Sequence, residues 1–413
     1  MAEGPQERLG RAYWRLWTAG TISNLGDGIE LAALPLLAAS LTRDPVLVAG
    51  LMTAARLPWL VFALLAGAIV DRLDRRRLMI AVNVSRAGLV GVIALTAATG
   101  TSRIWILYVV AFLLGINETL FDNAAQSMLP SVVPAHLLER ANGRQYAAEV
   151  VANSFAGPPI GGLLFSFVVA APFWADSASF AISAAIIATI GGSFRPVRAD
   201  GVGRERRSIR ADIAEGVRWL RRHRLLRTLA LLLGVLNLCS MMGFATFVLF
   251  SEEILGLDDR GYGFLLAAMA VGGVTGGVFG GRIAARLGPA RALLTCMAVN
   301  GVSYIAIGLV SSAWAVAALS LLEGLFSIVW NIITVSLRQR IIPDHLLGRV
   351  NSVYRFLGWG SMPIGAILGG LLADAFGLRA PFIVGGVAIL AAMIPALPRL
   401  TARAIAAAEA AAA

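Results

Sequence analysis

The feature that most constrains the fold is a series of long apolar runs bounded by arginine, proline, glycine or aspartate. A run of about 20 apolar residues has the length of an α-helix that crosses a bilayer. The apolar residues are continuous rather than alternating, which disfavours a membrane β-barrel. We predict twelve spans, at residues 16–41, 46–70, 78–99, 104–128, 145–169, 173–192, 227–251, 261–285, 291–311, 314–337, 351–374 and 380–397.

Composition supports an all-α integral membrane protein. The chain is 58% hydrophobic and 14% charged, whereas soluble domains are about half apolar and a quarter charged. Disorder, coiled coil and collagen are excluded by the same values. The first apolar run is too long for a signal peptide and has no clear cleavage site, so we expect it to remain as a span.

One long polar interruption divides the spans into six and six. We therefore predict an N-terminal six-helix bundle over 1–192, a cytoplasmic arginine-rich linker over 193–226, and a C-terminal six-helix bundle with a short tail over 227–413. Apolar residues recur at helical spacing in the linker, which predicts an amphipathic helix on the cytoplasmic membrane face. They are Ile209, Ile213, Val217 and Leu220.

The distribution of positive charge predicts the orientation. The net charge is +11, and all 35 basic residues are arginine. Most of them lie in the termini, the linker and the loops on one side of the spans. Positive residues stay in the cytoplasm, so we expect both termini there, in the inner or plasma membrane of a bacterium. Membrane lipids, rather than nucleic acid, are the expected partners of these arginines.

A short internal repeat predicts that the two halves are pseudo-symmetric. One copy follows the fourth span and the other, 209 residues later, follows the tenth. The matched residues are Pro134, His136, Leu137, Leu138, Arg140 and Asn142 with Pro343, His345, Leu346, Leu347, Arg349 and Asn351. A tandem duplication in parallel orientation would place a substrate path between the halves. The alternative is that both copies are merely good loop-to-helix connectors.

The loop between spans two and three carries a glycine, an acid four positions later and a basic cluster. These residues are Gly67, Asp71, Arg72, Arg75 and Arg76. The pattern resembles the hallmark of the major facilitator superfamily, although Asp74 stands where that family usually has glycine. The resemblance implies twelve helices in two halves and a cytoplasmic gate, in which the acid and the arginines form an ion-pair latch. The alternative is a simple positive anchor.

A second motif lies in the fifth span, at Gly157, Pro158, Gly161 and Gly162. It is similar to the antiporter motif of the same superfamily, which implies an exporter. Proline bends a helix and glycine lets a neighbouring helix approach, so the stretch should form a pliant seam. The alternative is packing alone. The whole pattern, over about residues 10–400, looks most like the branch of macrolide, siderophore and multidrug exporters.

Carboxylates inside the spans are candidates for proton coupling, because an ionised group in the bilayer is costly and therefore tends to have a use or a partner. Asp27 and Glu30 share one face of the first span, and Glu118 and Asp122 share one face of the fourth. Two close carboxylates repel, so one can hold a proton at neutral pH. Glu323 is alone in span ten.

The opposing cations inside the spans are Arg56 and Arg86. Arg86 and Asp122 are expected at similar depth, which predicts a structural ion pair between them. Asp176, near the start of span six, is interpreted as a helix cap.

Polar and aromatic side chains in the spans are candidates for a substrate cavity, and aromatic faces with nearby acids suit an amphipathic cation. The alternative for the tryptophans is an interfacial belt. The candidates are Asn24, Asn237, Trp330, Asn331, Tyr354 and Trp359.

Other chemistries have no support in the sequence. Cys239 and Cys296 are isolated in apolar runs and are expected to pack, with no disulfide or metal site. The chain has no nucleotide-binding loop and no lysine to serve one. We therefore expect neither an enzyme nor a bound cofactor.

The hypothesis that follows is a monomeric secondary transporter that exports a small amphipathic drug or metabolite against a proton flux by alternating access. One alternative is an importer or facilitator of a metabolite. Another is a membrane sensor or scaffold that no longer transports. The intramembrane acids disfavour this last function, because a protein without transport has no reason to retain their desolvation cost.

Overall fold

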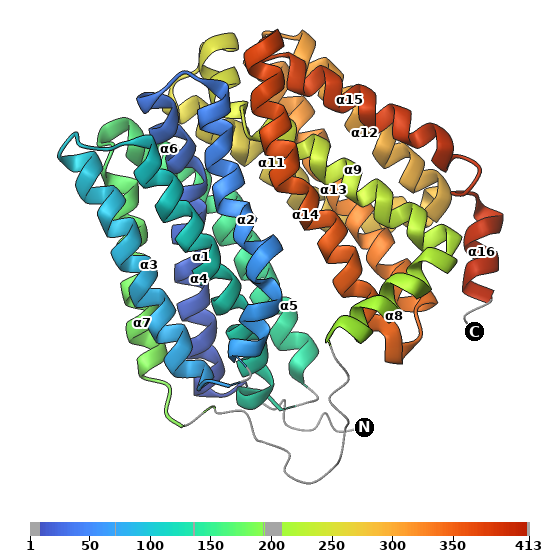
Figure 1. Cartoon of the computed structure of the whole chain (residues 1–413), viewed down its shortest axis with the longest axis horizontal. Helices are drawn as coiled ribbons and strands as arrows, with labels where there is room; N and C mark the ends of the chain where they lie inside the picture. The colour runs from blue at the N-terminus through green and yellow to red at the C-terminus, as the bar shows by residue number, and fades with distance from the viewer. Residues whose placement is uncertain (1–8, 71, 135–136, 193, 195–208, 411–413) are drawn as a thin grey trace, which may run out of the picture. The chain divides into compact units, whose positions relative to one another are not determined.

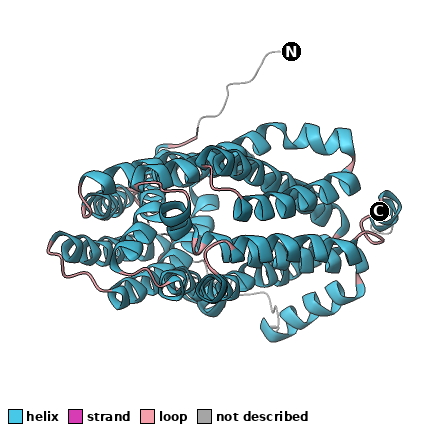
Figure 2. Cartoon of the chain, turned by 90° about the horizontal axis from the view of Figure 1, so that it is seen from above, coloured by secondary structure: helices cyan, strands magenta, loops and turns pink. Residues whose placement is uncertain are grey.

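The computed structural model describes residues 9–70, 72–134, 137–192, 194 and 209–410. In these residues all regular secondary structure is helical (Figure 2). Ten of the described helices are long and apolar enough to cross a membrane, which confirms the all-α membrane fold. The first and last predicted spans are not among the ten, because polar residues dilute the first and the last is short. The count of twelve stays a prediction.

The chain forms two compact units. The first comprises the described parts of Met1–Leu41 and Leu57–Ala199, and the second those of Thr42–Arg56 and Asp200–Ala413. Helices of the N-terminal half are α1 (Arg11–Leu41), α2 (Pro45–Val70), α3 (Arg75–Ala98), α4 (Ile104–Val132), α5 (Leu138–Glu149), η2 (Val150–Ala156), α6 (Gly157–Phe167) and α7 (Ala171–Ala188).

The C-terminal half also consists mainly of long helices, with several short ones between them (Figure 1). They are α8 (Ile209–Arg222), α9 (Arg224–Phe244), α10 (Phe247–Leu249), η3 (Phe250–Ile254), α11 (Asp259–Leu287), α12 (Pro289–Leu309), α13 (Ala313–Ile341), α14 (Asp344–Phe376), α15 (Ala380–Met393), η4 (Ile394–Ala396) and α16 (Ala402–Ala410).

The same neighbour relations occur in both units. In the first, α1 packs on α6 and α7, and α3 packs on α4 and α7. In the second, α9 packs on α14 and α15, and α12 packs on α13 and α15. The repeated segments also form the same turn: Leu137 N donates to Pro134 O and Leu346 N donates to Pro343 O, both at 2.9 Å. These correspondences agree with a duplicated half.

Helix α2 belongs to both units. Its first part groups with the second unit up to Arg56, and its remainder groups with the first unit. Ala49 and Met52 join a buried cluster with Met241, Ala245 and Ala366. Packing against α9 and α14 therefore holds the beginning of α2.

The predicted linker helix is present as α8. It packs against α14, where Arg349 Nη1 donates to Glu215 Oε2 at 2.6 Å. Leu220 is buried and Val217 packs against the same core. The side chains of Ile209 and Ile213 lie outside the described residues.

The fifth span is one long helix with a π-helical section, η2. The nitrogens of Pro158 and Pro159 carry no hydrogen, so the carbonyls one turn earlier lose their usual donors. The Gly157 N–H instead reaches the Ala152 carbonyl, five residues back. The proline pair thus explains a wider turn directly before α6.

Candidate functional site

The interior of the first unit contains an ion pair between α1 and α3. Arg86 Nη1 lies 3.8 Å from Asp27 Oδ2. The Arg86 side chain is 4% exposed and that of Asp27 is 23% exposed. The guanidinium also lies over the rings of Phe180, at 4.8 Å, and Phe121, at 5.6 Å. A desolvated cation is therefore held by one carboxylate and two aromatic faces.

Further carboxyls surround this pair. Glu118, Asp122 and Asp176 interact electrostatically with Arg86, and Glu30 interacts with Asp27 and lies beside Asp176. The four sequence candidates on α1 and α4 are thus brought together, and Asp176 of α7 joins them. We call this group the acidic cluster: Asp27, Glu30, Glu118, Asp122 and Asp176, around Arg86.

Two sequence interpretations need correction. The ion-pair partner of Arg86 is Asp27 and not Asp122, because depth along a helix does not tell which face meets α3. Asp176 does not cap a helix: it is the sixth residue of α7, fully buried, and accepts from Ser179 Oγ at 3.3 Å. Arg56, half-buried in α2, makes no ion pair with any described residue.

Another polar contact ties α2 to the acidic cluster. Trp59 Nε1 donates to Glu118 Oε2 at 3.2 Å. A hydrogen bond to one carboxylate oxygen orients the group without neutralising its charge. This contact therefore fixes the orientation of Glu118 on α4.

The antiporter motif lies directly against this part of α1. A Cβ at Gly157 would lie 2.5 Å from Gly28 Cα, and a Cβ at Gly161 would collide with the Ile29 carbonyl. Gly162 is also buried in α6. The seam is therefore backbone against backbone, and on α1 it falls between Asp27 and Glu30.

Among the described residues, the arginines of the loop motif contact the C-terminal end of α7 and a carbonyl of α4. Arg76 donates to the carbonyls of Ile187, Ala188 and Gly192, which lie at and just beyond the C-terminal end of α7, where a cation is favoured. Arg75 donates to Ser127 O at 2.9 Å. Asp71 lies outside the described residues, Gly67 lies in α2, and Arg72 is exposed; the latch stays a prediction.

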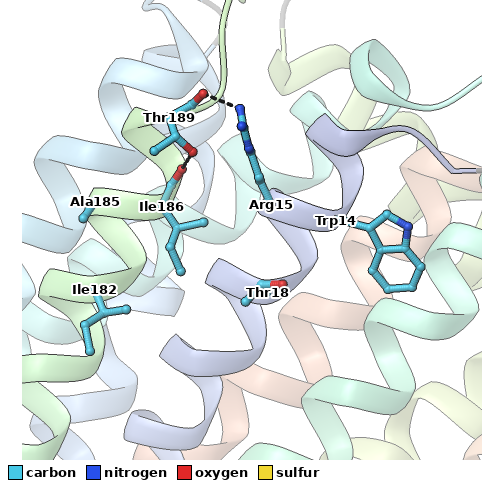
Figure 3. A pocket seen from close by; sticks show the side chains of 7 residues that line it. All are labelled: Trp14, Arg15, Thr18, Ile182, Ala185, Ile186 and Thr189. Carbon is cyan, nitrogen blue, oxygen red and sulfur yellow. Dashed lines mark hydrogen bonds between the residues drawn. The ribbon is translucent and has the colours of Figure 1, made fainter.

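Asp74 supplies the turn that the family pattern assigns to glycine. Its Oδ1 caps α3 by accepting from Arg77 N at 3.0 Å, and its Oδ2 accepts from Phe194 N at 3.0 Å. Arg15 of α1 adds a further donor at the same helix end, to Thr189 O at 2.6 Å, beside an open apolar groove between α1 and α7 (Figure 3). The motif thus fastens the loop to α7.

The second unit contains a cavity of 310 Å³. Five of the six cavity candidates line it, together with Glu323. Asn24 belongs to α1 of the first unit. The lining residues that the sequence singled out are Asn237, Glu323, Trp330, Asn331, Tyr354 and Trp359.

Hydrogen bonds fix one side of this cavity. Asn237 Nδ2 donates to Gly358 O at 2.9 Å, and Tyr354 Oη donates to Leu226 O at 2.8 Å. Arg338 lies over the Tyr354 ring at 4.6 Å and donates to Asn351 Oδ1 at 3.1 Å. This side of the cavity is therefore built by α9, α13 and α14, and these side chains have little freedom to move.

Asn300, Tyr304 and Arg338 are among the further lining residues that escaped the sequence analysis. Asn300 and Tyr304 are four apart on α12 and so share a face. The available signal in the sequence was a single asparagine in an apolar run, with a tyrosine one helical turn away. Among the described residues, no group of three or more histidine, cysteine or acidic side chains could hold a metal ion.

Comparison with known proteins identifies the family of this chain. The family model described as transmembrane secretion effector, a branch of the major facilitator superfamily, matches residues 9–412. The multidrug efflux pump Tap of Mycolicibacterium fortuitum is 29% identical over 402 residues, covering 92% of this chain and 94% of its own. Macrolide efflux protein A of Streptococcus pyogenes is 25% identical, covering 92% and 93%.

A solved structure agrees in fold. A bacterial homologue of the iron transporter ferroportin, crystallised in an inward-facing state, matches with a TM-score of 0.74 and 16% identity. The match covers 96% of this chain and 100% of the other. Together with the family match over nearly the whole chain, the membrane helices show that this protein is a multi-pass transporter of the cell membrane, not an enzyme, and that it belongs to the major facilitator superfamily.

Proposed function

We propose that this transporter exports a small amphipathic drug or secondary metabolite in exchange for protons, by alternating access of its two halves. The observation that carries the proposal is the acidic cluster. Several carboxyls share one guanidinium inside a membrane-spanning bundle, and such groups commonly mark proton relays. Relatives named as multidrug and macrolide efflux proteins support the direction and the class of substrate.

The geometry suggests how a proton could be coupled to movement. The side chain of Asp27 is 23% exposed and lies 3.8 Å from Arg86. When Asp27 takes a proton, Arg86 loses this attraction and turns toward the remaining carboxylates of the acidic cluster. Such a shift acts on α1 beside Gly28, where α1 touches the proline-containing span. The seam is then the two-state element that proton binding biases.

Orientation and assembly complete the proposal. With both termini in the cytoplasm, protons would enter the acidic cluster from outside and leave inside. Membrane lipids surround the spans, and a single chain contains both halves that alternating access requires, so we propose a monomer. An importer would use the same fold with the opposite net direction.

Transport in everted vesicles tests coupling. Proton movement and uptake of erythromycin and ethidium are measured together, in vesicles with wild-type protein, Asp27→Asn, and Asp374→Asn as a control at an exposed position near the end of α14. We expect Asp27→Asn to lower gradient-driven transport at least tenfold while binding persists, and the control to behave as wild type. Full pH-driven transport by Asp27→Asn would refute the proposed role of the cluster.

Direction is read in intact cells. Producing cells should accumulate less substrate than cells without the protein, and the difference should vanish when the proton gradient is collapsed. Greater accumulation in the producing cells would establish uptake and remove the exporter assignment.

A further inference from the structure

The cavity of the second unit contains buried polar atoms without partners. Asn300 is 7% exposed and Trp330 is 4% exposed. Asn300 Oδ1 and Trp330 Nε1 make no hydrogen bond with any described residue, and both residues line the cavity. Leaving a buried donor or acceptor unpaired costs about 1–3 kcal/mol. A bound molecule that accepts from the indole and donates to the amide would satisfy both groups.

The charges of the cavity are unequally engaged. Arg338 is stacked on Tyr354 and donates to Asn351 and to the Thr334 carbonyl. Glu323 makes no ion pair with any described residue. The two lie fifteen positions apart on α13, about 22 Å along the axis at 1.5 Å per residue. At one end of the cavity the contacts of Arg338 are thus already satisfied. At the other end Glu323 has no ion-pair partner among the described residues.

The surroundings of Glu323 complete a small recognition site. The carboxyl lies beside the Tyr304 hydroxyl, which itself donates to Ser240 O at 2.9 Å. Asn300 is one helical turn from Tyr304, and Trp330 is two turns from Glu323, so these groups share neighbouring faces. Leu233, Met362 and Ile389 supply apolar lining. The volume of 310 Å³ is at the lower end for ligand pockets.

We propose that this cavity binds a small protonated amine with an aromatic or aliphatic body, entirely within the C-terminal half. The ammonium would donate to Glu323 and Asn300 Oδ1, an ether, carbonyl or hydroxyl oxygen would accept from Trp330 Nε1, and the body would pack on the apolar lining. This inference deepens the proposed function by naming the substrate class. It also divides the labour: the acidic cluster moves protons and the other half binds the cargo.

Binding to purified protein in lipid nanodiscs tests the inference without any proton gradient. The probe is radiolabelled propranolol, a secondary ammonium with a hydroxyl, an ether oxygen and a naphthyl body. Its matched anion is 1-naphthoxyacetate. We expect saturable binding of propranolol and none of the anion. Equal saturable binding of both, or only non-saturable partition of propranolol, would overturn the proposal.

Three variants locate the site. Glu323→Gln should weaken propranolol binding at least tenfold, and Trp330→Phe, which keeps an aromatic ring but removes the indole N–H together with the five-membered ring, should weaken it several-fold. Asn300→Asp places a carboxylate beside the ammonium and should tighten binding. Asp374→Asn, at an exposed position of α14 that does not line the cavity, is the matched control. If Glu323→Gln does not fold, the gain with Asn300→Asp still decides. Unchanged affinity in Asn300→Asp and Trp330→Phe would show that the probe binds elsewhere.

The outcome is separable from that of the proposed function. Binding that depends on Asn300 and Trp330 without proton-linked export would retain the cavity and reject the coupling. Proton-linked export whose substrate affinity ignores these residues would retain the coupling and reject the cavity.

Discussion

Arg86 is the guanidinium that Asp27, Glu118, Asp122 and Asp176 share, so its side chain should matter more for stability than any single acid. Removing one partner of a buried ion pair costs about 3–5 kcal/mol, because a charge is left uncompensated; the partial exposure of Asp27 reduces this value. We predict that Arg86→Gln lowers the Tm of the purified protein by several degrees. Asp27→Asn should lower it less, since three further carboxyls still face Arg86.

The double variant provides the check. Without Arg86, Asp27 faces the other carboxyls of the acidic cluster with no cation between them. Removing Asp27 as well relieves that repulsion, so Asp27→Asn with Arg86→Gln should be more stable than Arg86→Gln alone. Thermal unfolding followed by circular dichroism in detergent measures all three. A double variant no better than the sum of the single losses would mean that Arg86 acts through its packing on Phe180 and not through charge.

At this scale the sequence predicts residue types better than partners. Helical spacing correctly placed Asp27 with Glu30, and Glu118 with Asp122, on shared faces, because that relation is local. The pairing of Arg86 depends on which faces of α1, α3 and α4 meet, and this is decided by packing. The same limit hid the inclusion of Asp176, whose position near a helix start looked like a cap.

The seam between α1 and the fifth span is a property of whole elements. Gly161 lies against the Ile29 carbonyl, with no space for a Cβ. We predict that Gly161→Ala separates the two helices and lowers export at least tenfold, since overpacking costs about 1–3 kcal/mol and here falls on the moving contact. Gly88→Ala in α3 is the control, because nothing lies within 4 Å of its added Cβ.

Export per molecule, normalised to the amount in the membrane, measures the effect. Equal export by Gly161→Ala and Gly88→Ala would reduce the motif to packing. A leak of protons without substrate would instead show that the seam couples the two fluxes.

Element boundaries followed from the sequence where apolar length decided them, and less where local chemistry intervened. The proline pair and glycines predicted a pliant stretch, but not the π-helical turn, because its register depends on which carbonyl the Gly157 N–H reaches. Likewise, the loop motif predicts an ion pair with Asp71, which lies outside the described residues. The motif did not predict that Arg76 donates to carbonyls at the end of α7, because no spacing in the loop reveals that contact.

Topology is a prediction for the whole molecule. Both native cysteines are buried, so the protein offers a quiet background for labelling. We expect a cysteine at Ala402 to react with a membrane-impermeant maleimide only in everted vesicles, and one at Thr101 only in intact cells. The physical reason is the concentration of arginine on the side of the termini.

Reaction of the Ala402 cysteine in intact cells would reverse the orientation and, with it, the direction in which the acidic cluster delivers protons. The sequence could predict this sidedness because it depends on loop charge. It could not predict how the cavity in the second unit closes around Trp330, because its lining comes from five helices, α9, α12, α13, α14 and α15.

The division of α2 between the two units has a mechanical consequence. Its first part is clamped by Ala49 and Met52 to α9 and α14, and the rest runs with the first unit. Pro58 stands two residues past the boundary at Arg56, and its missing N–H removes one rung of the helix ladder at that point. If one unit moves against the other, α2 has to bend, and the bending concentrates near Pro58, where a backbone hydrogen bond is missing. The elastic compliance of a few residues of α2 would then help to set how quickly the transporter cycles.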